Sequence, residues 1–186
     1  MFGKVVVIIG PVGSGKTTSM LVELEKYKAI GKRTVCIKDS ETITTEDGLG
    51  RTHDFTKYKC ISVFPDCLKS FIENTKTIDD YDVIGIDEGQ FFSGISGICE
   101  FLCNKKGKIV IISALLTDCE LQEFKETTKL LLIADEILYK RGICKICKLS
   151  ESCFSKKIKN TKNAKDPDNY FGVCKKCFYL SDKIST

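Results

Sequence analysis

The segment from Gly10 to Thr18, GPVGSGKTT, constrains the fold of this chain more than any other feature. It matches the pattern G-x-x-x-x-G-K-[ST] at every fixed position. In that pattern the glycines turn backbone N–H groups toward a phosphate, the lysine reaches the β- and γ-oxygens, and the last hydroxyl ligates Mg²⁺. An apolar run, residues 4–9, precedes the segment, and apolar residues at helical spacing follow it. A plain glycine turn is the alternative, and this strand–loop–helix context counts against it.

The pattern predicts a set of phosphate-binding residues. The helix that begins at about Lys16 also directs its positive end at the same anion. The predicted set is Gly10, Gly13, Ser14, Gly15, Lys16, Thr17 and Thr18.

Apolar runs and helical patterns alternate along the first three quarters of the chain. This alternation predicts an α/β fold with a mostly parallel sheet and helices on its faces. The polar stretch 38–59 predicts a loop. The expected strands are 4–9, 34–37, 83–87 and 109–113, and the expected helices are 16–29, 65–72 and 95–103.

Two adjacent carboxylates follow the third predicted strand, in the sequence VIGIDEGQFF. Asp87 ends the apolar run, where the second metal-binding acid of a phosphate-loop protein belongs. Glu88 comes next and suits a general base acting on a hydroxyl or water. A strand-end turn residue and a solvated carboxylate are the alternatives. The upstream loop favours the functional interpretation, with Mg²⁺ between Thr17 and Asp87.

The C-terminal quarter has a different character, rich in lysine, asparagine and cysteine. Two of its cysteine pairs have the CxxC spacing, Cys144/Cys147 and Cys174/Cys177. Four thiolates on two such knuckles suit a structural Zn²⁺ site with tetrahedral geometry. The alternative is a redox pair plus coincidence, which we disfavour because neither pair is predicted to open a helix after a strand. The division expected is residues 1–140 and 141–186.

Composition excludes several classes of protein. The net charge of +4 is only mildly basic and charges of both signs are interspersed, so a dedicated nucleic-acid binder is disfavoured. No apolar run approaches the ~20 residues of a membrane span. The first ten residues predict a strand and not a signal peptide, so we expect a cytoplasmic location, where disulfides are not the expected use of the eleven cysteines.

The order of motifs resembles the thymidine kinase family, in its zinc-containing type. The motifs are GPVGSGKTT, THD at residues 52–54, VIGIDEGQFF, FSKK at residues 154–157 and DNYFGVCKKCF. The resemblance covers almost the whole chain, and VIGIDEGQFF is its most specific part. It implies an α/β P-loop kinase core with a small C-terminal zinc-binding lid lobe. It also implies transfer of the γ-phosphate of ATP to the 5′-hydroxyl of thymidine, in a homotetramer or homodimer.

The resemblance assigns roles residue by residue. Glu88 matches the catalytic base, and Asp87 and Gln90 belong to the nucleotide-site segment. The implied zinc ligands are the cysteines of the two CxxC pairs. The implied substrate residues are Asp54, Phe91, Cys119 and Tyr170.

Departures from the family pattern gather in the base-binding half of the site. The family's ALDGTFQR is Ala114 to Leu121 here, ALLTDCEL, with Cys119 at the position of a phenylalanine that stacks on the base. Base stacking contributes about 1–3 kcal/mol in other nucleic-acid contexts. The lid sequence IGG is also altered, to 164–166, AKD.

Three functions are therefore open. The first is a thymidine kinase. The second is a thymidine-kinase-like protein with shifted base specificity or lost activity. The third is a P-loop ATPase whose zinc lobe binds nucleic acid, which we rank last because few aromatic residues accompany the lysines. The intact Lys16, Thr17, Asp87 and Glu88 favour the first.

Overall fold

The computed structural model describes residues 3–42, 49–52, 57–158 and 169–180. Six strands form one sheet in the order β5-β2-β6-β7-β1-β8, and all five pairings between them are parallel. The α/β fold with a mostly parallel sheet is thus confirmed. The sheet strands are β1 (Lys4–Ile9), β2 (Thr34–Asp39), β5 (Ile61–Val63), β6 (Val83–Asp87), β7 (Ile109–Ala114) and β8 (Glu136–Tyr139).

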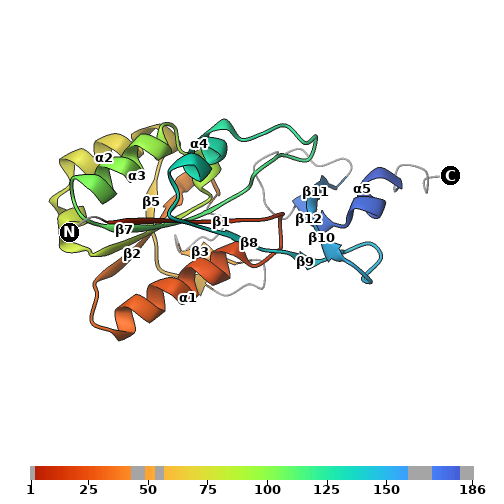
Figure 1. Ribbon diagram of the computed structural model, residues 1–186, viewed down its shortest axis with the longest axis horizontal. Coiled ribbons are helices and arrows are strands. Elements are labelled where there is room, and N and C mark those ends of the chain that lie inside the picture. Colours follow the sequence, from red (N-terminus) through yellow and green to blue (C-terminus); the bar gives the residue numbers. More distant parts are fainter. Residues whose placement is uncertain (1–2, 43–48, 53–56, 159–168, 181–186) are drawn as a thin grey trace.

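Helices cover both faces of this sheet, as Figure 1 shows. One face carries α1 (Lys16–Ala29) alone, and the other carries α2 (Leu68–Asn74), α3 (Ile95–Asn104) and α4 (Lys125–Ile133). Short 3₁₀ helices lie at 40–42, 65–67, 76–80 and 89–91. Among the described residues no helix is both long and apolar enough to cross a membrane.

Strand β1 lies between β7 and β8, and its position in the sheet explains why its sequence is apolar throughout. Val5 and Val7 pack into the core under α2, α3 and α4, whereas Val6 and Ile8 pack into the core under α1. Successive strand residues point to opposite faces, so a strand covered on both sides needs apolar residues at every position. Each such buried side chain stabilises the fold by about 1.5–3 kcal/mol.

The predicted elements match the structure closely, with two corrections. The expected helix 65–72 begins as a 3₁₀ helix at 65–67, and the α-helix itself is Leu68–Asn74. The expected loop 38–59 is wrong at its start, because β2 extends through Lys38 and Asp39. It is also wrong at β3 (Gly50–Arg51) and β4 (Lys57–Tyr58), which pair with each other. The parallel neighbours β5 and β6 supply hydrogen-bond partners that hold Lys38 and Asp39 extended despite their polarity.

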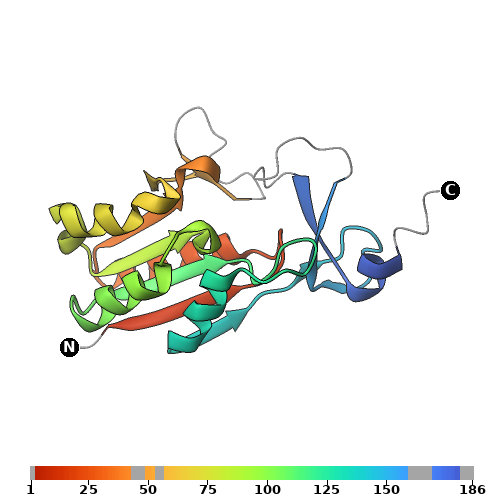
Figure 2. The same cartoon turned by 90° about the horizontal axis from the view of Figure 1, so that it is seen from above.

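The described parts of the C-terminal segment, residues 142–158 and 169–180, form small antiparallel sheets of their own. Strands β9 (Gly142–Ile143) and β10 (Glu151–Ser152) pair, as do β11 (Phe154–Lys157) and β12 (Tyr170–Val173). Helix α5 (Lys175–Leu180) follows β12. Figures 1 and 2 show this segment beyond the end of the six-stranded sheet, which leaves it beside the loop that follows β1.

Candidate functional site

The loop after β1 has the geometry of a phosphate cradle. Gly15 adopts a left-handed conformation, with φ of 80°, immediately before α1, and this conformation suits glycine. Lys16 is buried, and its Nζ donates a hydrogen bond to Pro11 O at 2.9 Å. The buried Ser14 Oγ has no hydrogen-bond partner within the described part of the chain. An unpartnered hydroxyl and backbone N–H groups at a helix N-terminus fit a phosphate.

A cavity of about 470 Å³ joins this loop to an aromatic region. The predicted residues Gly13, Gly15, Lys16, Thr17 and Thr18 line it. So do the predicted residues Glu88, Phe91, Cys119 and Tyr170. Four predicted residues do not line the cavity: Gly10, Ser14, Asp87 and Gln90. Asp54 and the altered lid 164–166 lie outside the described residues.

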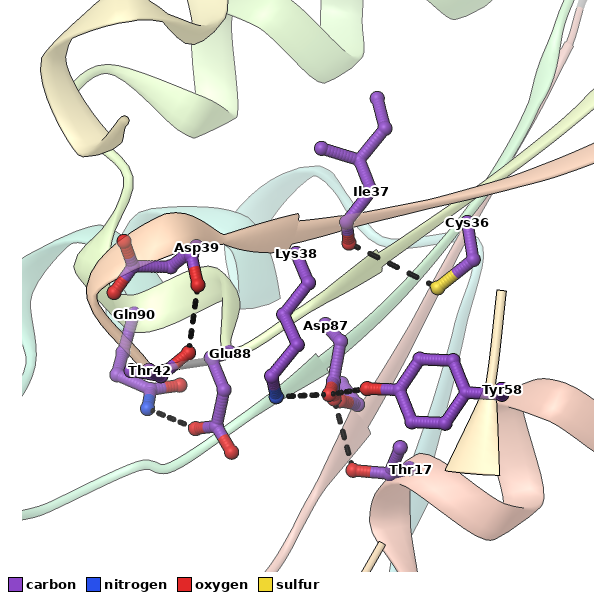
Figure 3. A network of polar contacts seen from close by, with 11 residues as sticks. Thr17, Cys36, Ile37, Lys38, Asp39, Thr42, Tyr58, Asp87, Glu88 and Gln90 are labelled. Carbon is purple, nitrogen blue, oxygen red and sulfur yellow. Dashed lines mark hydrogen bonds and ion pairs between the residues drawn. The ribbon is translucent and has the colours of Figure 1, made fainter. Parts of the chain in front are cut away.

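The carboxylate of Asp87 is the centre of a buried polar network (Figure 3). Its Oδ1 accepts hydrogen bonds from Thr17 Oγ1, at 2.9 Å, and from Ser113 Oγ. Its Oδ2 accepts from Lys38 Nζ at 2.8 Å and from Tyr58 OH at 2.6 Å. These donors come from α1, β7, β2 and β4, so one carboxylate ties four elements together.

Electrostatics keep this network charged. Burial raises the pKa of Asp87. The charge and hydrogen bond of Lys38 and the hydroxyls of Ser113 and Tyr58 lower it by more than burial raises it, so the pKa falls to about 2. Burial lowers the pKa of Lys38, and the charges of Asp87 and Glu88 more than offset this, so it stands above its ordinary value. For Lys16, burial outweighs the two carboxylates and the pKa is lowered.

Glu88 is presented to the cavity by an unusual backbone conformation. It has a φ of 57°, in the left-handed region that non-glycine residues rarely adopt. Its Oε2 accepts a hydrogen bond from Gln90 Nε2 at 2.7 Å, and Gln90 Oε1 accepts from Leu115 N at 2.9 Å. Gln90 is buried, so its position connects Glu88 to the strand end at β7. Strain of this kind concentrates at functional sites.

The aromatic part of the cavity contains one residue pair that the motifs did not reveal. The rings of Phe91 and Phe124 meet edge to face, with centroids 6.0 Å apart. Cys119 and Tyr170 line the same cavity. Burial, and then the nearby Cys119 and Asp118, raise the pKa of the Tyr170 hydroxyl. Phe92, by contrast, is fully buried in the core.

The C-terminal segment packs directly on the backbone of the phosphate loop. Val12 N donates a hydrogen bond to Ser155 Oγ at 3.0 Å. A side chain at Gly172 would place its Cβ 2.7 Å from Val12 O, and one at Gly142 would place it 2.8 Å from Gly13 O. The two backbones therefore approach as closely as glycine allows.

The four predicted cysteines form one cluster. The Sγ atoms of Cys144, Cys147, Cys174 and Cys177 all lie within 4.8 Å of one another, with 3.9 Å between Cys147 and Cys174. Tetrahedral zinc with bonds of about 2.3 Å needs sulfurs roughly 3.8 Å apart, so the cluster fits the ion. Helix α5 does begin directly after Cys174, which corrects our reason for disfavouring a redox pair. The redox pair is instead disfavoured because all four thiols lie in one cluster.

The pKa values of the thiols within this cluster differ from one another. Burial raises the pKa of Cys144, but backbone N–H groups of Cys147, Cys174 and Ile146 lower it to about 6. Burial and then the other three thiols raise the pKa of Cys177 to about 12. A divalent cation would favour the deprotonated form of all four thiols and hold them as thiolates.

Lys38, Tyr58, Ser113 and Phe124 were not predicted from the sequence. A signal existed for Lys38 and Ser113, which lie near the carboxyl ends of parallel strands beside β6, where ligand sites of such sheets form. Tyr58 lies in the two-residue strand β4, within a stretch whose sequence predicts a loop, and Phe124 precedes α4; neither carries a comparable signal.

Comparison with known proteins agrees with this geometry. A family model described as thymidine kinase matches residues 3–178. Thymidine kinase 1 of Dictyostelium discoideum is 35% identical over 97% of this chain and 79% of its own length. Thymidine kinases of Acanthamoeba polyphaga mimivirus and Myxoma virus (strain Lausanne) are 33% and 30% identical, covering 98% and 96% of this chain and 85% and 97% of their own lengths. The chain therefore belongs to the thymidine kinase family.

Proposed function

We propose that this protein is a thymidine kinase that transfers the γ-phosphate of ATP to the 5′-hydroxyl of thymidine. One observation carries the proposal: the phosphate loop, Glu88 and the aromatic residues Phe91, Phe124 and Tyr170 line a single cavity. A phosphate group and a flat base can therefore be held in the same cavity. The names of the relatives support thymidine as the acceptor.

Each residue then has a role that its position supports. Backbone N–H groups from Gly13 to Thr17 and the ammonium of Lys16 hold the phosphates. Glu88 takes the proton of the 5′-hydroxyl, for which its position on the cavity wall is suited. Phe91, Phe124 and Tyr170 enclose the base and exclude water, which competes as an acceptor.

Two metal ions belong to the proposal. Thr17 would hold Mg²⁺ directly, and Asp87 would act on the ion through the Thr17 hydroxyl; the ion supplies charge neutralisation at the β- and γ-phosphates. The site suits Mg²⁺ because this ion prefers oxygen ligands. Thr17 lines the cavity, and its hydroxyl is oriented by a hydrogen bond to Asp87. The four clustered cysteines would hold a structural Zn²⁺.

The proposal extends to organisation. Residues 1–140 would act as the nucleotide-binding core and 141–186 as a zinc lobe with the nucleoside lid. We expect a cytoplasmic homotetramer or homodimer, as the family resemblance implies.

A shifted base specificity is the second candidate, favoured by one observation. Cys119 lines the cavity where the family resemblance places a stacking phenylalanine. The third candidate, nucleic-acid binding by the C-terminal segment, gains no such support, because Phe154 and Phe178 pack on each other with centroids 5.0 Å apart.

Phosphate transfer from labelled ATP to thymidine, deoxyuridine, deoxycytidine and purine deoxynucleosides tests these functions. Transfer to thymidine is expected. Transfer only to another nucleoside would establish the shifted specificity. Absence of transfer to every nucleoside, with ATP still bound, would overturn the proposal.

A further inference from the structure

The carboxylate of Asp87 has no capacity left for another direct partner. An ionised carboxylate offers about four lone-pair sites. Thr17 and Ser113 occupy those of Oδ1, and Lys38 and Tyr58 occupy those of Oδ2. Asp87 is fully buried and does not line the cavity, whereas Thr17 does. Asp87 therefore acts on the cavity through the threonine hydroxyl that it orients.

Tyr58 differs from the other three donors in its origin. Thr17, Lys38 and Ser113 belong to α1 and to strands of the central sheet, which the core holds in place. Tyr58 belongs to β4, a two-residue strand that pairs only with β3 among the described strands. Its hydroxyl donates a hydrogen bond of 2.6 Å to Oδ2 and so connects the β3–β4 ribbon to the carboxylate of Asp87.

The tyrosine ring is aimed at Asp87 by close packing on Gly50. A Cβ added at Gly50 would lie 2.3 Å from Cζ and 2.7 Å from the hydroxyl oxygen of Tyr58. No side chain fits there unless the ring moves. Figure 3 shows the ring pointing from its strand toward Asp87, with Lys38 reaching the carboxylate from the opposite side; both side chains donate to Oδ2.

We propose that Tyr58 is a positioning residue for the magnesium-dependent part of nucleotide binding. Its hydroxyl holds Oδ2, and Oδ1 is thereby held toward Thr17, whose hydroxyl hydrogen is committed to Asp87 and whose oxygen stays available for the metal. The inference rests on the proposed function, because it assumes a metal-bound nucleotide beside Thr17. Partners that orient metal ligands typically contribute 10–100-fold to metal affinity or activity.

The loss of this bond would leave the ion pair intact. In Tyr58→Phe the Lys38 ammonium still donates to Oδ2, so Asp87 keeps its charge partner and the ring still packs on Gly50. The variant therefore removes one constraint on the orientation of the carboxylate. It changes neither the phosphate loop nor Glu88.

Calorimetric titration with a non-hydrolysable ATP analogue tests the proposal. In EDTA, Tyr58→Phe is expected to bind the analogue as the original chain does. With Mg²⁺ present, the concentration of Mg²⁺ that half-saturates the enhancement of binding is expected to rise about 10-fold. An unchanged Mg²⁺ dependence together with a lower melting temperature would overturn the proposal and leave Tyr58 a purely structural residue.

Two further variants keep the test specific. Tyr81→Phe is the matched control, because Tyr81 precedes β6 at the end opposite Asp87, and it should leave the Mg²⁺ dependence unchanged. Gly50→Ala should displace the tyrosine ring and reproduce the effect. Adding Tyr58→Phe to Gly50→Ala should cause little additional change, because residues in contact are not additive. Full additivity would count against the proposal.

Failure of the proposed function is distinguishable from failure of this inference. Consider the result that the original chain binds the analogue with Mg²⁺ but transfers no phosphate to any nucleoside. That result would overturn the proposed kinase function. The comparison of Mg²⁺ dependences between Tyr58→Phe and the original chain would still decide the role of Tyr58.

Discussion

At the scale of single residues, Glu88 and Asp87 are neighbours with opposite environments. Asp87 is buried and has four hydrogen-bond donors, whereas Glu88 faces the cavity with Gln90 as a partner. A saturated carboxylate suits orientation of other groups, and a carboxylate in the cavity suits proton transfer. In the proposed mechanism these two tasks are therefore separated within one dipeptide.

Replacing Glu88 by glutamine tests the proton-transfer role. The change keeps the shape of the side chain and removes its basicity, so kcat should fall at least ~100-fold while ADP binding is retained. Steady-state kinetics and calorimetry measure the two quantities. Glu100→Gln, an exposed change on α3, is the control and should leave both unchanged. Equal turnover in the two variants would rule out Glu88 as the base.

Removing the charge partner of Asp87 should change how stability depends on pH. The folded pKa of Asp87 is about 2, below its ordinary value, so its contribution to stability is present near neutral pH and lost as pH falls toward 2. In Lys38→Met the main cause of that lowering is absent and burial raises the pKa instead. Protonation then stabilises the folded variant.

The deficit of Lys38→Met in unfolding free energy is therefore expected to be about 3–5 kcal/mol at pH 7, the range for breaking a buried ion pair, and smaller at pH 4. Urea unfolding at the two pH values measures it. A deficit that stays constant or grows as the pH falls would contradict the assigned ionisation of Asp87.

At the scale of elements, the phosphate loop is supported from two sides. β1 and α1 set its ends, and the β11–β12 ribbon packs on its backbone through Ser155 and Gly172. The conformation of the loop thus depends on an element more than 140 residues later in the chain, by the separation of Val12 and Ser155. Nucleotide affinity should respond to changes in that ribbon.

Gly172→Ala tests this support. The added Cβ would lie 2.7 Å from Val12 O and 2.8 Å from Ser152 Oγ, so the ribbon must move away from the loop. A KM for ATP raised about tenfold or more is expected, because misplaced binding groups lose affinity steeply.

The matched control is Gly97→Ala in α3, where an added Cβ meets nothing within 4 Å. That change should leave the KM for ATP unchanged and stabilise the helix by up to ~1 kcal/mol. A KM that is equal in the two variants would show that the ribbon does not support the loop.

At the scale of the whole molecule, the cysteine cluster holds together the segment that completes the cavity. Cys144, Cys174 and Val173 form a small buried core against which Phe154, Phe171 and Phe178 pack. A core of this size stabilises little by itself, and small lobes of this kind depend on a metal. The cavity residues Ser155 and Tyr170 belong to this segment.

Removal of the metal should therefore impair folding and activity together. Cys174→Ser or chelation is expected to lower the melting temperature, the soluble yield and the turnover, and elemental analysis should find about one zinc per chain. Cys153→Ser, a cysteine outside the cluster, is the control. A metal-free preparation with full activity and an unchanged melting temperature would refute the zinc site.

The sequence by itself determined the framework of this protein. Strands β1 and β6 and helix α1 begin and end where their apolar patterns do, because burial on a sheet face or a helix stripe repeats with a short local period. The P-loop, the Asp87–Glu88 dipeptide and the two CxxC pairs could be recognised for a similar reason, since each motif lies within a few neighbouring residues.

Only the tertiary structure decided what surrounds those motifs. Lys38, Tyr58 and Ser113 lie 49, 29 and 26 residues from Asp87, and no local pattern links them to it. The same holds for Ser155, which meets the P-loop at Val12. A hydrogen bond to a buried group depends on how strands are ordered in the sheet and how loops return to it. That order is set by packing of the whole chain, beyond the reach of any single stretch of sequence.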